Sequence, residues 1–291
     1  MKAIFILTLC IILIAFYPSF SQNPKPSDNI RLFGVIVDHA SEKFLGYASI
    51  GILNKPVGTV SDSLGHFELT IGSEYLDDTL QVSMIGYYPV KRLIRELVKV
   101  DSSVVVNLTK KVTRLNEVVV SNKFQHTIIV GRQSSGTLIQ ASIIPKSGKE
   151  PIIGAESGLK IKAQHYPVLL DNFNFYTSAN NFKYVKFRVN IYSLKNNLPD
   201  TLLFNQEILV SLKDYKTGWT QINLIPYHMV INNDFAVTLQ WVDYNKDMVK
   251  SPEILIPVGI SFSHINYFRT ASQDKWKSVK GNCSFYVTLK D

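Results

Sequence analysis

The chain has 291 residues, of which 46% are hydrophobic and 11% aromatic, enough for two domains that each have a core. This composition excludes a wholly disordered chain, and the 15 glycines and 12 prolines exclude a collagen-like or linker-dominated one. Two cysteines can form neither a disulfide scaffold nor a multi-cysteine zinc site, and the formal net charge is +8.

The first 21 residues are predicted to be a secretory signal peptide. Lys2 provides the positive start, and an apolar run follows over residues 3–16. Small side chains, Ser19 and Ser21, then stand at the −3 and −1 positions before Gln22. We therefore expect export, cleavage of the signal, and a mature chain that begins at Gln22.

Two other interpretations of this segment fit less well. A transmembrane anchor needs about 20 apolar residues, and Pro18 interrupts the run early. A lipoprotein signal would use Cys10, but that cysteine lies inside the apolar run and follows Leu9 rather than a small residue. No later stretch is apolar enough to span a bilayer, so no transmembrane segment is expected in the mature chain.

The positive charge of the mature chain lies in its second half. Residues 22–125 hold 12 basic and 11 acidic side chains, whereas residues 126–291 hold 18 and 12. Export argues against nucleic acid as a partner, which leaves acidic glycans, lipid headgroups or an acidic protein face. The alternative is an ordinary solvated basic surface.

Short strands separated by turn residues are predicted after a leader over residues 22–29. They are residues 32–37, 48–53, 58–61, 66–71, 80–85, 104–108 and 117–120. Asp62 to Gly65 is predicted to be a tight turn in which the glycine takes positive φ. Residues 90–98 carry a weak signal for one helical turn. This pattern predicts an antiparallel sandwich over residues 30–121.

Five short motifs occur in order within this region. They are Gly34-Val-Ile-Val-Asp38, Ala48-Ser-Ile-Gly-Ile52, Gly58-Thr-Val-Ser-Asp62 with Gly65-His-Phe67, Ser83-Met-Ile-Gly-Tyr87 and Leu115-Asn-Glu-Val-Val-Val120. The series resembles the carboxypeptidase-regulatory-like domain of Gram-negative cell-envelope proteins, a transthyretin-like Greek-key sandwich. The resemblance implies this fold for residues 30–121 and a place in the periplasm or at the outer membrane.

The activities of proteins that carry this domain are not implied for this chain. In many relatives the domain precedes the plug and barrel of a TonB-dependent transporter, but only 170 residues follow Ser121 here, without regular membrane strands. In carboxypeptidases the domain is an accessory to a separate catalytic domain, which this sequence lacks. Neither transport nor peptidase activity is therefore expected.

A second sandwich, jelly-roll-like, is predicted over residues 137–291 after a linker over residues 122–136. Alternating apolar and polar residues recur in 159–163, 185–191, 219–224 and 235–241. One face of the last predicted strand holds every second residue from Cys283, namely Phe285, Val287 and Leu289. This apolar face predicts a buried and unreactive thiol.

No motif for catalysis, a metal or a cofactor is present. The six histidines have no partner at metal-binding spacing, and both the serine-hydrolase elbow and a complete phosphate loop are missing. A glycosidase would need two carboxylates that face each other across a cleft. No sequence rule selects such a pair among the acidic residues of the second half, so no catalytic residue is predicted.

One segment of the second domain suggests a binding surface, because eight aromatic residues stand between Tyr166 and Tyr192, interleaved with asparagines. Every second residue from Val185 to Ile191 is apolar and must face the core. The residues between them then face outward together, about 6.6 Å apart. The candidate ligand-binding residues are Tyr184, Lys186, Arg188 and Asn190. The alternative is that this row is only the solvated face of a sheet.

The sequence thus predicts an all-β protein of two antiparallel β-sandwiches in series. We expect an exported, non-catalytic cell-envelope protein in which the first domain is a structural or docking module. The second domain would recognise an acidic glycan or an envelope protein. Two alternatives remain: a glycan-active hydrolase with its site on the second sandwich, and an accessory subunit of an outer-membrane assembly whose edge strands pair with a neighbour.

Overall fold

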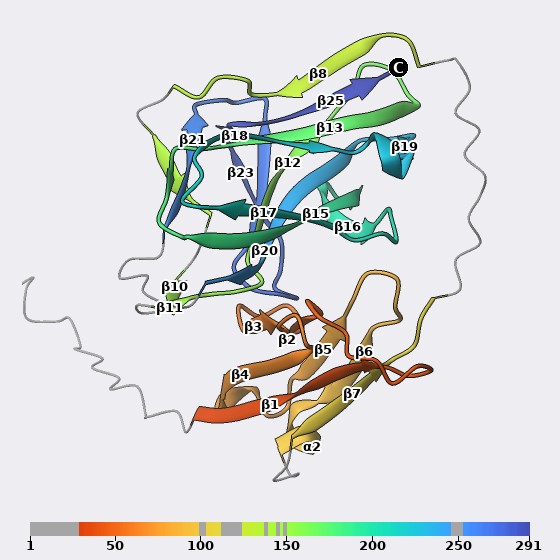
Figure 1. Ribbon diagram of the computed structural model, residues 1–291, viewed down its shortest axis with the longest axis vertical. Coiled ribbons are helices and arrows are strands. Elements are labelled where there is room, and N and C mark those ends of the chain that lie inside the picture. Colours follow the sequence, from red (N-terminus) through yellow and green to blue (C-terminus); the bar gives the residue numbers. More distant parts are fainter. Residues whose placement is uncertain are drawn as a thin grey trace, which may run out of the picture.

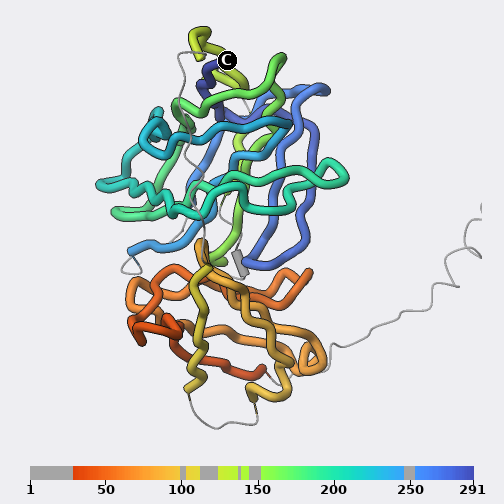
Figure 2. The backbone as a smooth tube through the Cα atoms, turned by 90° about the vertical axis from the view of Figure 1, so that its right-hand side faces the viewer, coloured from red at the N-terminus to blue at the C-terminus, as the bar shows by residue number. Residues whose placement is uncertain are grey.

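The computed structural model describes residues 29–98, 103–111, 124–136, 139–143, 146–147, 150–245 and 253–291. These residues form two domains built from β-strands, stacked one on the other along the long axis of the molecule (Figures 1 and 2). The signal peptide and the strand predicted over 117–120 lie outside the described residues, so both stay predictions. Within the described ranges, no helix is long and apolar enough to cross a membrane.

The first domain is a sandwich of two sheets. Its elements are β1 (Asn29–Asp38), β2 (Ser49–Ile52), β3 (Gly58–Val60), β4 (His66–Gly72), η1 (Ser73–Tyr75), β5 (Thr79–Ser83), β6 (Val90–Leu93), α2 (Ile94–Val98) and β7 (Val104–Leu108). The strand orders are β4-β1-β7 and β3-β2-β5-β6. One pair departs from the expected antiparallel arrangement, because β7 runs parallel to β1. The chain reaches β7 by way of α2, and such a crossover is what a parallel pair requires.

Alternating side chains build the core of the first domain as predicted. In β4, Phe67, Leu69 and Ile71 are buried, while the residues between them are exposed. They pack against side chains of the opposite sheet, among them Ile50 and Leu80. The two sheets thus bury one face each in this core, and in β2 the other face is buried as well.

Gly65 takes a φ of +79°, which confirms the predicted turn. Its N–H donates to the Asp62 carbonyl at 3.1 Å, and a Cβ at this position would lie 2.8 Å from the Ile36 carbonyl oxygen. Replacing Gly65 with Val is therefore expected to lower the free energy of unfolding by about 1–2 kcal/mol. A denaturant titration measures this loss. The control is Gly136→Val, where a Cβ meets nothing within 4 Å and the midpoint should not move.

The second domain contains the remaining elements. They are β8 (Thr127–Gly131), β9 (Gln140–Ser142), β10 (Lys146–Ser147), β11 (Glu150–Pro151), β12 (Glu156–Ile161), β13 (Val168–Thr177), β14 (Ala179–Asn180), β15 (Tyr184–Lys195), β16 (Leu198–Leu202), β17 (Ile208–Lys213), β18 (Gly218–Asn223), η2 (Ile225–Tyr227), β19 (Val230–Ile231), β20 (Phe235–Tyr244), β21 (Ile254–Gly259), β22 (Ile265–Arg269), β23 (Lys277–Lys280), β24 (Asn282–Cys283) and β25 (Phe285–Lys290).

Two large sheets enclose the core of this domain. The seven-stranded sheet has the order β16-β15-β20-β12-β22-β23 with β17 also on β15, and the five-stranded sheet has the order β18-β13-β25-β8 with β19 also on β13. A smaller sheet, β14-β21-β24 with β9 on β21, flanks them. Most neighbouring strands are far apart in the sequence, as in a jelly roll. The all-β class with two domains is confirmed.

The prediction of a linker over residues 122–136 is wrong in its middle part, which forms a strand. Residues 127–131 form β8, which pairs in antiparallel register with β25 from Gly131 opposite Tyr286 to Thr127 opposite Lys290. The second domain therefore begins before the expected boundary at residue 137. The hydrogen bonds that β8 makes with the C-terminal strand are long-range contacts, which local composition does not encode.

The predicted core face of β15 is confirmed, because Val185, Phe187, Val189 and Ile191 are all buried. In β20, however, both faces are buried over Phe235–Val242 instead of one. Two groups of side chains cover the outer face of this strand. Tyr192 and Tyr267 of the second domain pack on Ala236, and the first domain contacts Gln240.

Cys283 packs at the margin of the second core and is partly buried. Burial raises the pKa of its thiol to about 11, against an ordinary value near 8.5. Since the thiolate is the reactive species, Cys283 is expected to react slowly with a thiol reagent at pH 8 in the native protein and rapidly in denaturant. Labelling followed by mass spectrometry measures both rates. Equal rates would contradict the buried position.

Candidate functional site

The two domains meet through polar contacts on the outer face of β15 and β20. The Gln240 side chain donates to Ser49 Oγ at 3.0 Å, and the Arg188 guanidinium donates to the backbone carbonyl of Tyr47. The backbones of the two domains also approach closely at Gly51, where an added Cβ would lie only 2.0 Å from the Ser272 carbonyl oxygen. Only a glycine in β2 permits this approach.

Gln273 holds the first domain from the other side of the same interface. Its side-chain amide donates to Ser83 Oγ at 2.8 Å and accepts from Gln81 Nε2 at 2.7 Å. Its backbone carbonyl accepts from the Asn54 N–H at 2.9 Å. Gln273 makes these contacts with a backbone φ of +66°, a conformation that is rare for a residue other than glycine. The short segment after β22 is thus shaped to fit the first domain.

A buried carboxylate organises the polar side chains beneath this interface. Glu156 has a side chain that is 0% exposed, and Arg269 donates to its Oε2 at 2.5 Å. Asn190 Nδ2 donates to Glu156 Oε1 at 2.8 Å, and the hydroxyls of Thr238 and Tyr192 also donate to this carboxylate. The charge of Glu156 is therefore fully paired and hydrogen-bonded, as a buried charge must be.

The electrostatics fix the protonation states of Arg269 and Tyr192. Burial acts to lower the pKa of Arg269, but the interactions with Glu156, Tyr192 and Asp274 together outweigh burial, and the pKa is raised above its ordinary value. Burial, and secondarily the Glu156 carboxylate, raises the pKa of Tyr192 far above its ordinary value. Arg269 stays charged and Tyr192 stays neutral at any working pH.

Arg188 is a second buried arginine, paired with a partly exposed glutamate. It is 2% exposed and donates through Nε and Nη2 to Glu207 Oε1 at 2.9 and 2.6 Å. Its Nη1 donates to Gln240 Oε1 at 3.0 Å, and its contact with Tyr47 reaches the first domain. One guanidinium thus joins β15, β20 and the first domain.

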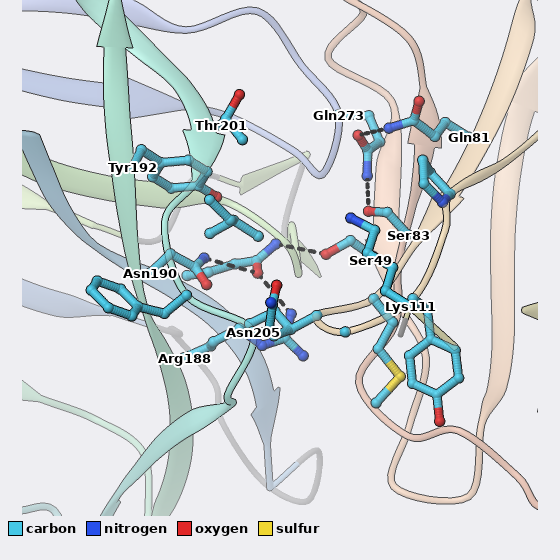
Figure 3. Close-up of a pocket in the computed structure, with 18 of the residues that line it drawn as sticks. Ser49, Gln81, Ser83, Lys111, Arg188, Asn190, Tyr192, Thr201, Asn205 and Gln273 are labelled. Atoms are coloured by element: carbon cyan, nitrogen blue, oxygen red, sulfur yellow. Dashed lines mark hydrogen bonds between the residues drawn. The ribbon is translucent and has the colours of Figure 1, made fainter. Parts of the chain in front are cut away.

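Arg188, Asn190 and Gln240 are part of one wall of a cavity of about 300 Å³ between the domains (Figure 3). The polar lining residues are Ser49, Gln81, Ser83, Tyr87 and Lys111 of the first domain, and Arg188, Asn190, Tyr192, Asp200, Thr201, Asn205, Gln240, Arg269 and Gln273 of the second. In Figure 3, Arg188, Asn190, Tyr192 and Thr201 lie on one side, and Ser49, Gln81, Ser83 and Lys111 lie on the other, with Gln273 beside Gln81 and Ser83. A small polar molecule would meet hydrogen-bonding groups on both sides.

Asn190 carries an unused acceptor in this wall. Its Nδ2 faces Glu156 and Gln240, both of which offer oxygen acceptors, so the orientation of the amide is determined. Its Oδ1 is buried and has no hydrogen-bond partner among the described residues. A buried acceptor without a donor is costly, and it marks a place where a ligand hydroxyl or N–H would be stabilised.

The four residues of the predicted binding row have two different positions in the structure. Arg188 and Asn190 line the cavity, whereas Tyr184 and Lys186 do not. Lys186 donates to the Tyr47 hydroxyl and lies 4.3 Å from the centre of that ring. The row faces away from the core of the second domain, as predicted, and the first domain covers it at Lys186 and Arg188, a point that the sequence left open. Whether the four residues bind a ligand stays a prediction.

Several residues of the cleft were missed by sequence reasoning. Gln240 had a usable signal, since it lies on the polar face of the strand predicted over 235–241 and pairs across the sheet with Arg188. Glu156 and Arg269 are also cross-strand partners, but nothing in the sequence links β12 to β22. Gln273 follows no periodic pattern at all.

Comparison with known proteins names the first domain. Residues 32–120 match the family model of the CarboxypepD_reg-like domain, which confirms the resemblance seen in the sequence. The match does not extend into the second domain, and no curated protein sequence matches the chain.

Among solved structures, the chain is similar to the cysteine protease and lectin-like domains of Cwp84, a surface layer associated protein of Clostridium difficile. The identity is 9% and the TM-score is 0.41. The similarity covers 80% of this chain and 45% of that structure, so the chain spans less than half of its length.

Proposed function

We propose that this protein is an exported, non-catalytic binding protein of the cell envelope whose interdomain cleft binds a glycan. The first domain is docked on the second and contributes one wall of the cleft. A glycan suits this site because its hydroxyl groups both donate and accept hydrogen bonds, as the polar lining demands.

The observation that carries this proposal is the unpartnered Oδ1 of Asn190 in the cavity wall. A sugar hydroxyl or N-acetyl N–H supplies the missing donor. Arg188 and Arg269 are each already paired with a glutamate, so their charges do not require an acidic ligand. Lys111 is the cleft cation that an acidic sugar would contact, so an acidic glycan adds one ion pair to the same hydrogen bonds.

Binding is favoured over hydrolysis by the placement of the carboxylates. Glycoside hydrolysis uses two carboxyl groups on either side of the scissile bond. Among the described residues that line the cleft, Asp200 is the one carboxylate. Glu156 and Glu207 are both held by arginines, which leaves neither of them ready to transfer a proton to a sugar.

The test is titration calorimetry of the protein against neutral and uronic-acid oligosaccharides. Thr201 is exposed and lines the cavity, so Thr201→Trp should fill the space and weaken binding by about tenfold or more. Lys111→Gln should weaken binding of the uronic-acid sugars selectively.

Two matched variants serve as controls. Lys110 is the neighbour of Lys111 but does not line the cavity, so Lys110→Gln should bind like the parent. Tyr184→Ala tests the outer part of the predicted row. If Tyr184→Ala abolishes binding while Thr201→Trp leaves it unchanged, the glycan binds outside the cleft and the proposal is wrong.

A further inference from the structure

The loop between β21 and β22, residues 260–264, presents its apolar side chains to solvent. Ile260 is 80% exposed and Phe262 is 82% exposed, the highest exposures among the large hydrophobic residues in the described part of the chain. Isolated exposed apolar residues are common, but two that protrude from one short loop indicate an interaction site.

The polar side chains of this loop hydrogen-bond to one another. His264 Nδ1 lies 2.8 Å from Ser261 Oγ and 3.2 Å from Ser263 Oγ, and the His264 N–H donates to Ser261 Oγ at 3.3 Å. The His264 carbonyl accepts from the Gly281 N–H at 3.2 Å, which fastens the loop to the next hairpin. The outward position of the two apolar side chains is therefore built into the loop.

The loop lies at the end of the second domain opposite the interface. β22 begins beside the loop at Ile265 and reaches the cleft at Arg269, about 13 Å further along the strand. In Figure 1, β21 points away from the first domain, so the loop that follows it is free of the interdomain contact.

Two basic side chains lie beside the loop. Lys280 pairs with Ile265 across β22 and β23, next to the loop, and it is exposed. The Arg132 guanidinium lies against Gly259, the last residue before the loop. An apolar tip with basic side chains beside it is the pattern of a peripheral membrane contact.

We propose that this loop docks the protein on a lipid bilayer with anionic headgroups. Ile260 and Phe262 enter the boundary between headgroups and acyl chains, and Lys280, which lies beside the loop, contacts a lipid phosphate. A protein partner fits less well, since a stable interface buries about 800 Å² on each side and two protruding side chains provide far less. A bilayer accepts such a small insertion without shape complementarity.

The test is vesicle flotation of the purified protein with phosphatidylethanolamine and phosphatidylglycerol at 3:1. All variants share one N-terminus, verified by mass, so that differences between them report on the loop. The variant Ile260→Ser/Phe262→Ser should reduce the partition coefficient by about tenfold or more. The variant Lys280→Gln should reduce it by roughly fivefold at 0.1 M salt and much less at 0.5 M salt.

The control variant is Leu64→Ser/Tyr88→Ser, which removes residues 60% and 56% exposed on the first domain and should bind like the parent. Insertion itself is measured with Phe262→Trp, whose emission should shift to the blue and be quenched by brominated acyl chains. A parent that binds no vesicle overturns the proposal, as does equal binding by the serine variant. A parent dimer that the serine variant converts to a monomer would also overturn it, because the loop would then join two copies.

Discussion

Replacing Glu156 with Gln is expected to lower the free energy of unfolding by about 3–5 kcal/mol. The amide keeps the shape of the side chain, but it removes the charge that Arg269 faces at 2.5 Å in a site where the Glu156 side chain is fully buried. A buried guanidinium without a counter-charge is costly. The Thr238 and Tyr192 hydroxyls donate to different oxygens of the carboxylate, and the amide keeps only one acceptor oxygen, so one of the two hydroxyls loses its acceptor. A urea titration monitored by tryptophan fluorescence measures the loss.

Two further variants test whether the loss of stability comes from a charge that is both buried and unpaired. Glu68 pairs with Arg31 on the surface, where both side chains are at least half exposed, so Glu68→Gln should cost less than about 1 kcal/mol. Adding Arg269→Met to Glu156→Gln should restore much of the loss, since no unpaired charge then remains buried. If Glu156→Gln alone costs less than about 1 kcal/mol, Arg269 finds another partner and the cluster is not a structural unit.

Replacing Arg188 with Met is expected to cost about 3–4 kcal/mol and to loosen the contact between the domains. Methionine fills most of the space but donates no hydrogen bond. The Gln240 amide oxygen and the Tyr47 carbonyl then lose a donor, and the Glu207 carboxylate loses its partner. Glu207 is 27% exposed and recovers part of its hydration, which keeps the cost below that at Glu156.

The measurement combines a denaturant titration with limited proteolysis between the domains. Arg188→Met should speed cleavage in the segment after residue 111, whereas Arg92→Met, which changes an exposed arginine of β6, should leave both readouts unchanged. An unchanged midpoint for Arg188→Met would show that Gly51 and Gln273 hold the interface without it. A binding assay on Arg188 variants must be read with this loss of stability in mind.

Alternation of apolar and polar residues decided much of what was predicted correctly. Because successive side chains of a strand point to opposite faces, Phe67, Leu69 and Ile71 had to share the core of the first domain, and Val185 to Ile191 that of the second. The turn at Gly65 followed from local chemistry, since only glycine takes its φ without strain. Such features need only neighbours in sequence.

The candidate site depended on contacts that a periodic pattern does not contain. Alternation established that Arg188 and Asn190 lie on the outer face of β15, but it carries no information about what covers that face. Here the first domain covers that face. Gly51 allows the backbones of the two domains to approach closely, and Gln273 holds the first domain by hydrogen bonds. A row that would be solvated on an isolated domain thereby becomes the wall of a cavity.

The same division holds for the molecule as a whole. Strand positions, the two cores and the identity of the first domain were determined by the sequence itself, through patterns that repeat every two residues and through short ordered motifs. The pairing of β8 with β25, the Glu156 cluster and the cleft were decided only by the tertiary structure. Each of them joins residues more than 30 positions apart, and the free energy of such contacts depends on burial and geometry that exist only after folding.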